Sequence, residues 1–235
     1  MRRGKRYLTV RERIDRERVY PLDDALNLVV ETATARFDET AEAAFRLGVN
    51  PSQHMIRGAV SLPHGIGRQV VVLAFAKGER IREAEAAGAD YVGGEELAEK
   101  IQDGWLEFDR VVATPDTMEF VGRLGPILGP RGMMPNPKSG TVTQEIGEMI
   151  RELKQGRLEF RVDSHSNLHT PFGKASFPID ALRENFIALT VAVLEARPNE
   201  LKGKYLRGAA VSSTMGPGIK LDIDEVHAVA AERML

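Results

Sequence analysis

The period of the hydrophobic pattern changes along this chain, and that change limits the possible folds more than any other feature. Over residues 40–49, apolar side chains such as Ala43 and Phe45 alternate with polar ones such as Glu42, which is the pattern of a strand with one covered face. Residues 70–75 form a continuous apolar run, which indicates a strand covered on both faces. The sequence therefore predicts two different kinds of sheet in one chain.

Helical and extended segments alternate through the middle of the chain. We expect strands at residues 70–75, near Tyr91 and Val92, and at 110–113, helices at 79–87, 95–102 and 145–155, and a glycine- and proline-rich loop at 122–140. Alternation of this kind is typical of βαβ units around a small parallel sheet.

Strands and helices of a different character precede and follow that middle region. We expect a helix at 21–34 and strands at 40–49 and 57–62 before it, and strands at 157–162 and 168–177, a helix at 178–196 and a strand pair at 204–213 and 218–223 after it. The helix at 178–196 should bury a stripe made by Leu182, Phe186, Leu189 and Val193. Both chain ends are therefore predicted to form one discontinuous domain, residues 1–67 and 160–235, with residues 68–159 inserted as a second domain.

Net charge and cysteine content narrow the classes of function. The formal net charge is -2 and the pI about 6.3, whereas a domain that holds nucleic acid by bulk electrostatics usually has a pI above roughly 9. Residues 2–18 are the most basic stretch, although a solvated helix face has the same pattern. The chain has no cysteine, which excludes disulfides and thiolate zinc sites. No apolar run approaches the roughly 20 residues of a membrane span, so we expect a cytoplasmic protein without a membrane partner.

Candidate enzyme sites in the sequence are weak. Gly125, Gly129 and Gly132 match neither a dinucleotide-binding fingerprint nor a GxxxxGK[ST] loop. His165 and His169 are four residues apart, but the small polar residues around them indicate a hairpin turn and not a metal-binding helix. The carboxylates are scattered along charged helices, where solvated ion pairs are the ordinary interpretation. We therefore predict that the protein is not an enzyme and uses no metal or cofactor.

Four segments taken together resemble one known family. They are residues 35–40 (ARFDET), 124–138 (LGPILGPRGMMPNPK), 173–177 (GKASF) and 213–217 (STMGP). They resemble the family of the first protein of the bacterial large ribosomal subunit, the protein of the mobile stalk next to the tRNA exit site. The similarity runs in unbroken order from about Gly4 to Asp222, and the second segment alone is highly specific. The acidic net charge and the helical tail after Asp222 depart from the family pattern.

The resemblance implies a fold of the α/β and α+β classes with two domains. The chain ends would form a split-βαβ-like RNA-binding domain, and the insert would be a Rossmann-like three-layer α/β domain. The implied function is that of a structural constituent of the large subunit, monomeric when free, which binds the stalk of large-subunit ribosomal RNA. It would also assist release of deacylated tRNA from the exit site and repress translation of its own mRNA. The alternative is a small-molecule-binding Rossmann-type protein, which needs a polar site at the carboxyl ends of the middle strands.

The resemblance also implies an RNA-binding surface. Its residues would be Arg36, Phe37, Thr40, Glu42, Arg46, Lys174, Ser176, Ser213, Thr214, Met215 and Gly216. Hydroxyl, amide and aromatic groups suit a structured RNA, which is recognised by shape, by 2′-hydroxyl and phosphate contacts and by stacking. Two plainer interpretations stay open, namely that Phe37 is a core residue and that residues 214–217 are only a hairpin turn. In the loop at 125–138, Arg131 and Lys138 are further candidates to contact RNA or tRNA.

Overall fold

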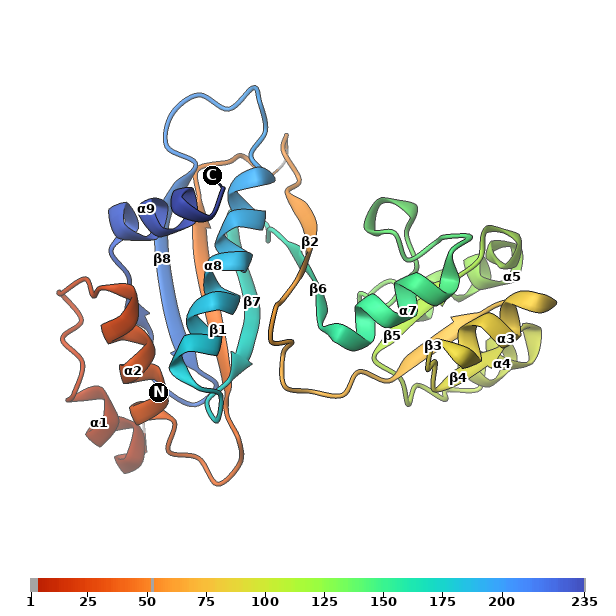
Figure 1. Ribbon diagram of the computed structural model, residues 1–235, viewed down its shortest axis with the longest axis horizontal. Coiled ribbons are helices and arrows are strands. Elements are labelled where there is room, and N and C mark those ends of the chain that lie inside the picture. The colour runs from red at the N-terminus through yellow and green to blue at the C-terminus, as the bar shows by residue number, and fades with distance from the viewer. Residues whose placement is uncertain (1–3, 52, 235) are drawn as a thin grey trace. The chain divides into compact units, whose positions relative to one another are not determined.

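The computed structural model describes residues 4–51 and 53–234, and the chain divides into two compact units. Unit 1 combines the amino-terminal part up to Gly67 with the part that begins at Leu158, and unit 2 is Arg68–Arg157. Figure 1 shows both units, with the red and blue ends of the chain together in unit 1 and the yellow and green middle in unit 2. The boundary expected between residues 159 and 160 falls inside a strand, β6 (Arg157–Arg161).

Unit 1 is built around an antiparallel sheet with the strand order β7-β1-β8-β9. Its strands are β1 (Thr40–Leu47), β7 (Asn167–Lys174), β8 (Leu206–Ser213) and β9 (Ile219–Lys220), and β2 (Arg57–Ser61) pairs separately with β6. The central strand β1 comes from the amino-terminal part, and its neighbours β7 and β8 come from the carboxyl-terminal part. The sheet therefore cannot form from either part alone.

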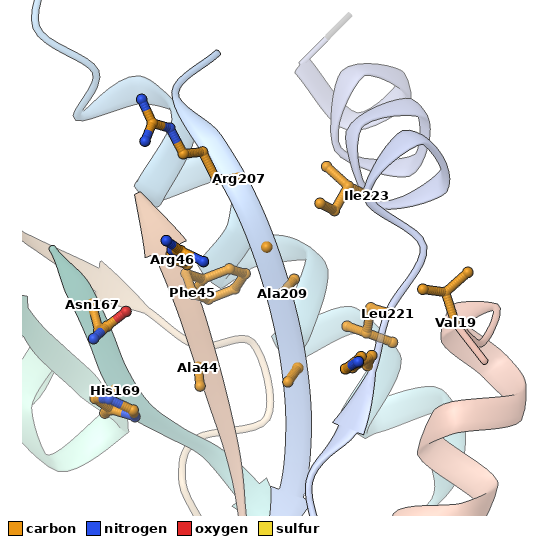
Figure 2. A pocket seen from close by; sticks show the side chains of 13 residues that line it. Val19, Ala44, Phe45, Arg46, Asn167, His169, Arg207, Ala209, Leu221 and Ile223 are labelled. Atoms are coloured by element: carbon orange, nitrogen blue, oxygen red, sulfur yellow. The ribbon is translucent and has the colours of Figure 1, made fainter. Parts of the chain in front are cut away.

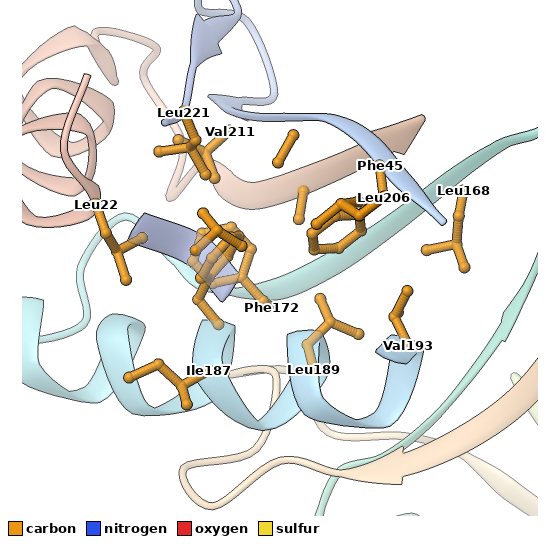
Figure 3. Packing of buried hydrophobic residues seen from close by; sticks show 14 of the residues in the cluster. Leu22, Phe45, Leu168, Phe172, Ile187, Leu189, Val193, Leu206, Val211 and Leu221 are labelled. Carbon is orange, nitrogen blue, oxygen red and sulfur yellow. The ribbon is translucent and has the colours of Figure 1, made fainter. Parts of the chain in front are cut away.

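One face of this sheet is covered by helices and the other is open. Along β1 the buried Ala43 and Phe45 alternate with the exposed Glu42 and Arg46, as the sequence predicts. The helices α2 (Leu22–Thr32) and α8 (Ile179–Glu195) pack on the covered face, and the predicted stripe of α8 is buried. Figure 3 shows Phe172, Phe45 and Leu189 between the sheet and α8. Each such side chain contributes about 1.5–3 kcal/mol of hydrophobic stabilisation, so unit 1 has its own core.

Unit 2 contains a parallel sheet with the order β4-β3-β5. Its elements are β3 (Val72–Phe75), α3 (Glu79–Ala86), β4 (Tyr91–Gly93), α4 (Glu95–Gln102), β5 (Arg110–Ala113) and α7 (Ile146–Gln155). On β3, Leu73 and Phe75 pack toward α4, whereas Val72 and Ala74 pack toward α3 and α7. The strand covered on both faces, predicted from the continuous apolar run, is confirmed, and unit 2 has the three layers that the resemblance implies.

The expected loop at 122–140 is wrong in its first half. The helical turns η2 (Gly122–Leu124) and α6 (Gly125–Leu128) form there, directly after η1 (Pro115–Thr117) and α5 (Met118–Val121). A last turn follows at η3 (Pro137–Ser139). Leu124 and Leu128 are fully buried in the core of unit 2, and Pro126 lies in the first turn of α6, where proline suits a helix. Arg131 is exposed as predicted, while the side chain of Lys138 lies outside the described part of the chain.

The two chain ends meet within unit 1. Of the basic amino-terminal stretch, only α1 (Lys5–Arg11) is helical, and Arg2 and Arg3 lie outside the described residues. The predicted helical tail is confirmed as α9 (Ile223–Met234), which packs on α8 and buries Val226. The first residue of α2, Leu22, has a backbone N–H that donates to Glu225 Oε1 at 3.3 Å. Since the residue before α2 is a proline without a side-chain cap, this carboxylate stabilises the start of the helix. Among the described helices, none has the length and apolar character needed to cross a membrane.

Candidate nucleic-acid interface

Three of the four segments that carry the family resemblance meet at one end of the open-faced sheet. Residues 35–40 lead into β1, residues 173–177 lie at the end of β7, and residues 213–217 lie at the end of β8. Because both neighbours run antiparallel to β1, their ends flank its beginning, with Thr40 opposite Lys174. We call these three segments together the junction.

Predicted RNA-binding residues hold the junction together through hydrogen bonds. The backbone N–H of Thr40 donates to Thr214 Oγ1 at 2.9 Å, and the backbone N–H of Thr214 donates to the carbonyl of Thr40 at 3.0 Å. Lys174 Nζ donates to Thr40 Oγ1 at 3.0 Å and to the carbonyl of Asp38 at 3.3 Å. An ammonium group has three donors, so Lys174 keeps one for a ligand while its position is fixed by the other two.

Glu39 links all three segments, and sequence analysis missed it. Its side chain is only 1% exposed. Glu39 Oε1 accepts the backbone N–H of Ala35 at 2.7 Å, and Oε2 accepts the backbone N–H of Met215 at 2.8 Å. Its carbonyl oxygen accepts the N–H of Ala175 at 2.8 Å. This one residue therefore fixes the backbone on both sides of β1.

The same contacts decide the charge of Glu39. Burial raises the pKa of this carboxyl group, but the backbone hydrogen bonds from Met215 and Ala35, together with the positive charge of Arg6, outweigh it. The pKa of Glu39 therefore lies below the ordinary value for a glutamate. The carboxylate is ionised at neutral pH, the state in which it accepts both N–H groups.

The junction presents apolar side chains to solvent. Phe37 is 56% exposed and Met215 is 51% exposed, which is unusual for large apolar side chains. The interpretation of Phe37 as a core residue is therefore wrong. Arg36, Ser176 and Thr214 are also exposed, whereas Ser213 is buried. Glu42 and Arg46 are exposed farther along β1.

Gly216 is required in this turn by a close approach. A Cβ atom at this position would lie 2.4 Å from Ser213 Oγ, a distance that no side chain tolerates without movement of its neighbours. The backbone N–H of Gly216 donates to the carbonyl of Ser213 at 3.1 Å, which closes the turn. Residues 214–217 are thus a tight turn, as the plainer interpretation holds, and the same turn exposes Thr214 and Met215.

The edge of unit 2 where a nucleotide would be expected is occupied by the protein's own contacts. Beyond the carboxyl ends of β3 and β5, Thr117 Oγ1 donates to the carbonyls of Thr114 at 2.8 Å and Phe75 at 3.3 Å. Arg80 pairs with Asp116 at 2.8 Å in the same region. Of the histidine pair, His165 lies in a turn, whereas His169 lies on β7, so the expectation of a hairpin loop is wrong for His169. Within the described residues, no group of three His, Cys, Asp or Glu could hold a metal ion.

The architecture defines a class of two-unit proteins in which a parallel α/β unit interrupts an open-faced α+β unit. The model of the Ribosomal protein L1p/L10e family matches residues 29–217. Two relatives from Thermus thermophilus, both named large ribosomal subunit protein uL1, are each 55% identical to this chain over 222 residues, which are 93% of this chain and 97% of the relative. The chain belongs to the ribosomal protein L1p/L10e family. The resemblance found from the four segments is thereby confirmed.

Proposed function

We propose that this protein is a structural constituent of the large ribosomal subunit that binds the stalk of its ribosomal RNA through the junction. Family membership supports the ribosomal role. The observation that carries the site is the exposure of Phe37 and Met215 on a backbone that Glu39 holds in place. Apolar and aromatic groups beside hydroxyl and backbone groups suit recognition of RNA by shape and stacking.

The proposed contact residues fall into two groups by exposure. Arg36, Phe37, Thr40, Glu42, Arg46, Lys174, Ser176, Thr214, Met215 and Gly216 would touch the RNA, and Ser213, which is buried, would support the turn. All of them lie in the predicted RNA-binding domain, residues 1–67 and 160–235. The inserted domain, residues 68–159, would take no part in this RNA contact. Its residue Arg131 would instead contact tRNA.

The proposal extends to two activities that the resemblance implies. On the ribosome the protein would assist release of deacylated tRNA from the exit site. Free in the cytoplasm as a monomer, it would repress translation of its own mRNA. The physical basis of repression is competition, because an mRNA segment with the shape of the ribosomal site would occupy the same junction.

A binding titration tests the proposal. The full chain is titrated with a stalk-sized fragment of large-subunit ribosomal RNA at 50 and 200 mM salt, with a plain duplex of equal length as control. A protein that neutralises 6–10 phosphates loses about 10³–10⁵ in affinity over this range, and a chain of net charge -2 should lose markedly less. Equal affinity for the plain duplex would contradict recognition of a stalk structure.

A competition experiment tests repression separately. The leader of the protein's own mRNA is added to the complex with the ribosomal fragment, and release of the labelled fragment is followed. We expect mutually exclusive binding. A ternary complex of the protein with both RNAs would show that the junction is not the shared site.

A further inference from the structure

The open face of the unit 1 sheet carries a hollow of about 370 Å³ outside the junction. Its lining residues come from all four strands, and Val19 and Ile223 line it from outside the sheet. Figure 2 shows Arg46, Arg207, Asn167 and His169 around the hollow, with Ala44 on β1 between them. Sequence analysis placed only Arg46 of these residues in a site.

The charge of this hollow differs from that of the whole protein. The chain has 34 acidic and 32 basic residues, yet the hollow is lined by Arg46, Arg207, Lys220 and His169 and by no carboxylate. The side chains of Arg46, Arg207 and Lys220 form no ion pair or hydrogen bond with any described residue. These three cations are therefore free to bind an anion.

The middle of the hollow's floor is formed by residues with small side chains. Across the sheet, His169 lies opposite Ala44, Ala44 opposite Ala210, and Ala210 opposite Lys220. Strands lie about 4.8 Å apart, so this row spans about 14 Å, with small side chains in its middle. Gly208, which faces Arg46, adds no side chain at all. A flat group can lie on this floor while the flanking cations reach its charged ends.

We propose that the hollow binds one unpaired nucleotide of the RNA held at the junction. The base would lie over Ala44 and Ala210, and the adjoining phosphates would pair with Arg46 and Arg207 at one end of the hollow and with Lys220 on the neighbouring strand. Continuity supports this, because the exposed face of β1 runs from the junction at Thr40 to Arg46. The inference rests on the proposed function and adds to it a second contact region, built from residues outside the junction.

The first test removes the cations. In the full chain, Arg207→Ala with Lys220→Ala is compared with Arg161→Ala plus Lys202→Ala, which removes the same charge from exposed positions outside the hollow and the junction. Each lost phosphate contact lowers the magnitude of the slope of log affinity against log salt by about one. For the variant with Arg207→Ala and Lys220→Ala, the slope should therefore fall by about two, and RNA should bind more than about tenfold more weakly at 50 mM salt. The control pair should leave the affinity and the slope nearly unchanged.

The second test fills the floor without changing charge. A Cβ atom at Gly208 would meet only Arg46 Cβ at 3.6 Å, an ordinary contact, so Gly208→Ala fits the folded protein. Gly208→Val adds two more methyl groups, on a residue type that suits a strand. We expect the melting temperature of Gly208→Val to be kept, its RNA affinity to fall about tenfold and its salt slope to stay the same, since the phosphate contacts are intact. Gly208→Ala, which adds one methyl group, should lie between Gly208→Val and the wild type.

The outcomes separate this inference from the proposed function. If the wild-type chain does not bind the stalk fragment, the proposed function is contradicted. A wild-type chain that binds, with the cation pair and Gly208→Val both unaffected, overturns only the hollow. Weaker binding by the cation pair with full affinity of Gly208→Val also overturns the inference, because the hollow would then hold a phosphate without a base.

Discussion

The two sheets of this protein differ in whether helices cover one face or both. In unit 2 all four residues of β3 are buried, because helices cover both faces. In unit 1 helices cover one face, and β1 alternates between core and solvent. A strand covered on both faces has no side chain left for a ligand, whereas β1 offers every second one. A large ligand can therefore bind to the sheet of unit 1 itself, whereas in unit 2 only loops and helices are left to bind one.

Ion pairs are also distributed unequally between the two units. Four of the six salt bridges of the described residues lie in unit 2, including Arg68 with Asp109 and Lys154 with Asp90. On the open face of unit 1, Arg46 and Arg207 have no such partner among the described residues. The positive charge of this face is therefore available to a ligand even though the whole chain is acidic.

The greatest loss of stability is expected when an alanine in the sheet of unit 2 is replaced by aspartate, in contrast to the same substitution in the sheet of unit 1. Ala74→Asp on β3 would bury an unpaired carboxylate, which we expect to destabilise unit 2 by more than about 4 kcal/mol. Ala44→Asp on the open face of β1 should cost no more than about 1 kcal/mol. Urea unfolding followed by circular dichroism measures both variants. Similar losses of stability would show that the open face of β1 is covered in solution.

A smaller effect is expected at the base of the junction. Glu39→Ala leaves the partly buried N–H groups of Ala35 and Met215 without their acceptor, which should cost about 1–3 kcal/mol in total and weaken RNA binding. Glu31→Ala, which removes an exposed carboxylate from α2, is the matched control. Hydrogen exchange should become faster at the Ala35 and Met215 amides in the first variant only. Unchanged exchange there would contradict the positioning role of Glu39.

The contribution of Glu39 should also depend on pH. Its pKa in the folded protein is lower than the ordinary value of 4.5. A group with a depressed folded pKa stabilises the fold above its unfolded pKa and loses that contribution as the pH falls through its folded pKa. The difference in unfolding free energy between the wild type and Glu39→Gln should therefore be constant near neutral pH and shrink below about pH 4.5. A constant difference down to pH 2 would contradict the ionised state.

A binding effect without a stability effect is expected at Phe37. Its ring is 56% exposed, so Phe37→Ala should leave the melting temperature nearly unchanged. Loss of a stacked or packed ring should weaken RNA binding by about 1–3 kcal/mol. Both quantities are measured on one preparation. Full RNA affinity in the stable variant would remove Phe37 from the site.

The smallest effect is expected from loss of unit 2. Replacement of residues 68–156 by a short linker keeps β6 whole and should leave the affinity for the stalk fragment within about 0.5 kcal/mol, because the proposed contacts all lie in unit 1. Circular dichroism must show that unit 1 is still folded. A larger loss from the folded variant would show that unit 2 shares the RNA contact.

Much of the fold was predictable because the spacing of apolar residues along the chain indicates which faces of a helix or strand are buried. The helix at 95–102 and the strand at 110–113 have the predicted bounds, and the stripe of α8 is buried as expected. The turns at 115–128 were not predictable from glycine and proline content, since the burial of Leu124 and Leu128 depends on tertiary packing that short segments do not reveal.

The candidate site was predictable only in part, for a different reason. The family segments pointed to Phe37 and Met215, and the register of β1 explains why segments so far apart in sequence meet. Glu39 lies inside one of those segments, but a buried carboxylate and a solvated one look the same in sequence. Arg207 and Lys220 were equally hidden, because only the antiparallel pairing places them on one face with Arg46.

The interrupted order of unit 1 has a consequence for synthesis of the chain. Every residue of unit 2 has been made once Arg157 is added, so unit 2 can complete its core while the polypeptide is still growing. The central strand β1 must wait for β7 and β8, and the start of α2 must wait for Glu225. The amino-terminal segment that includes Phe37 and Glu39 therefore stays without its partners in the junction until β8 and the turn at 213–217 have been synthesised.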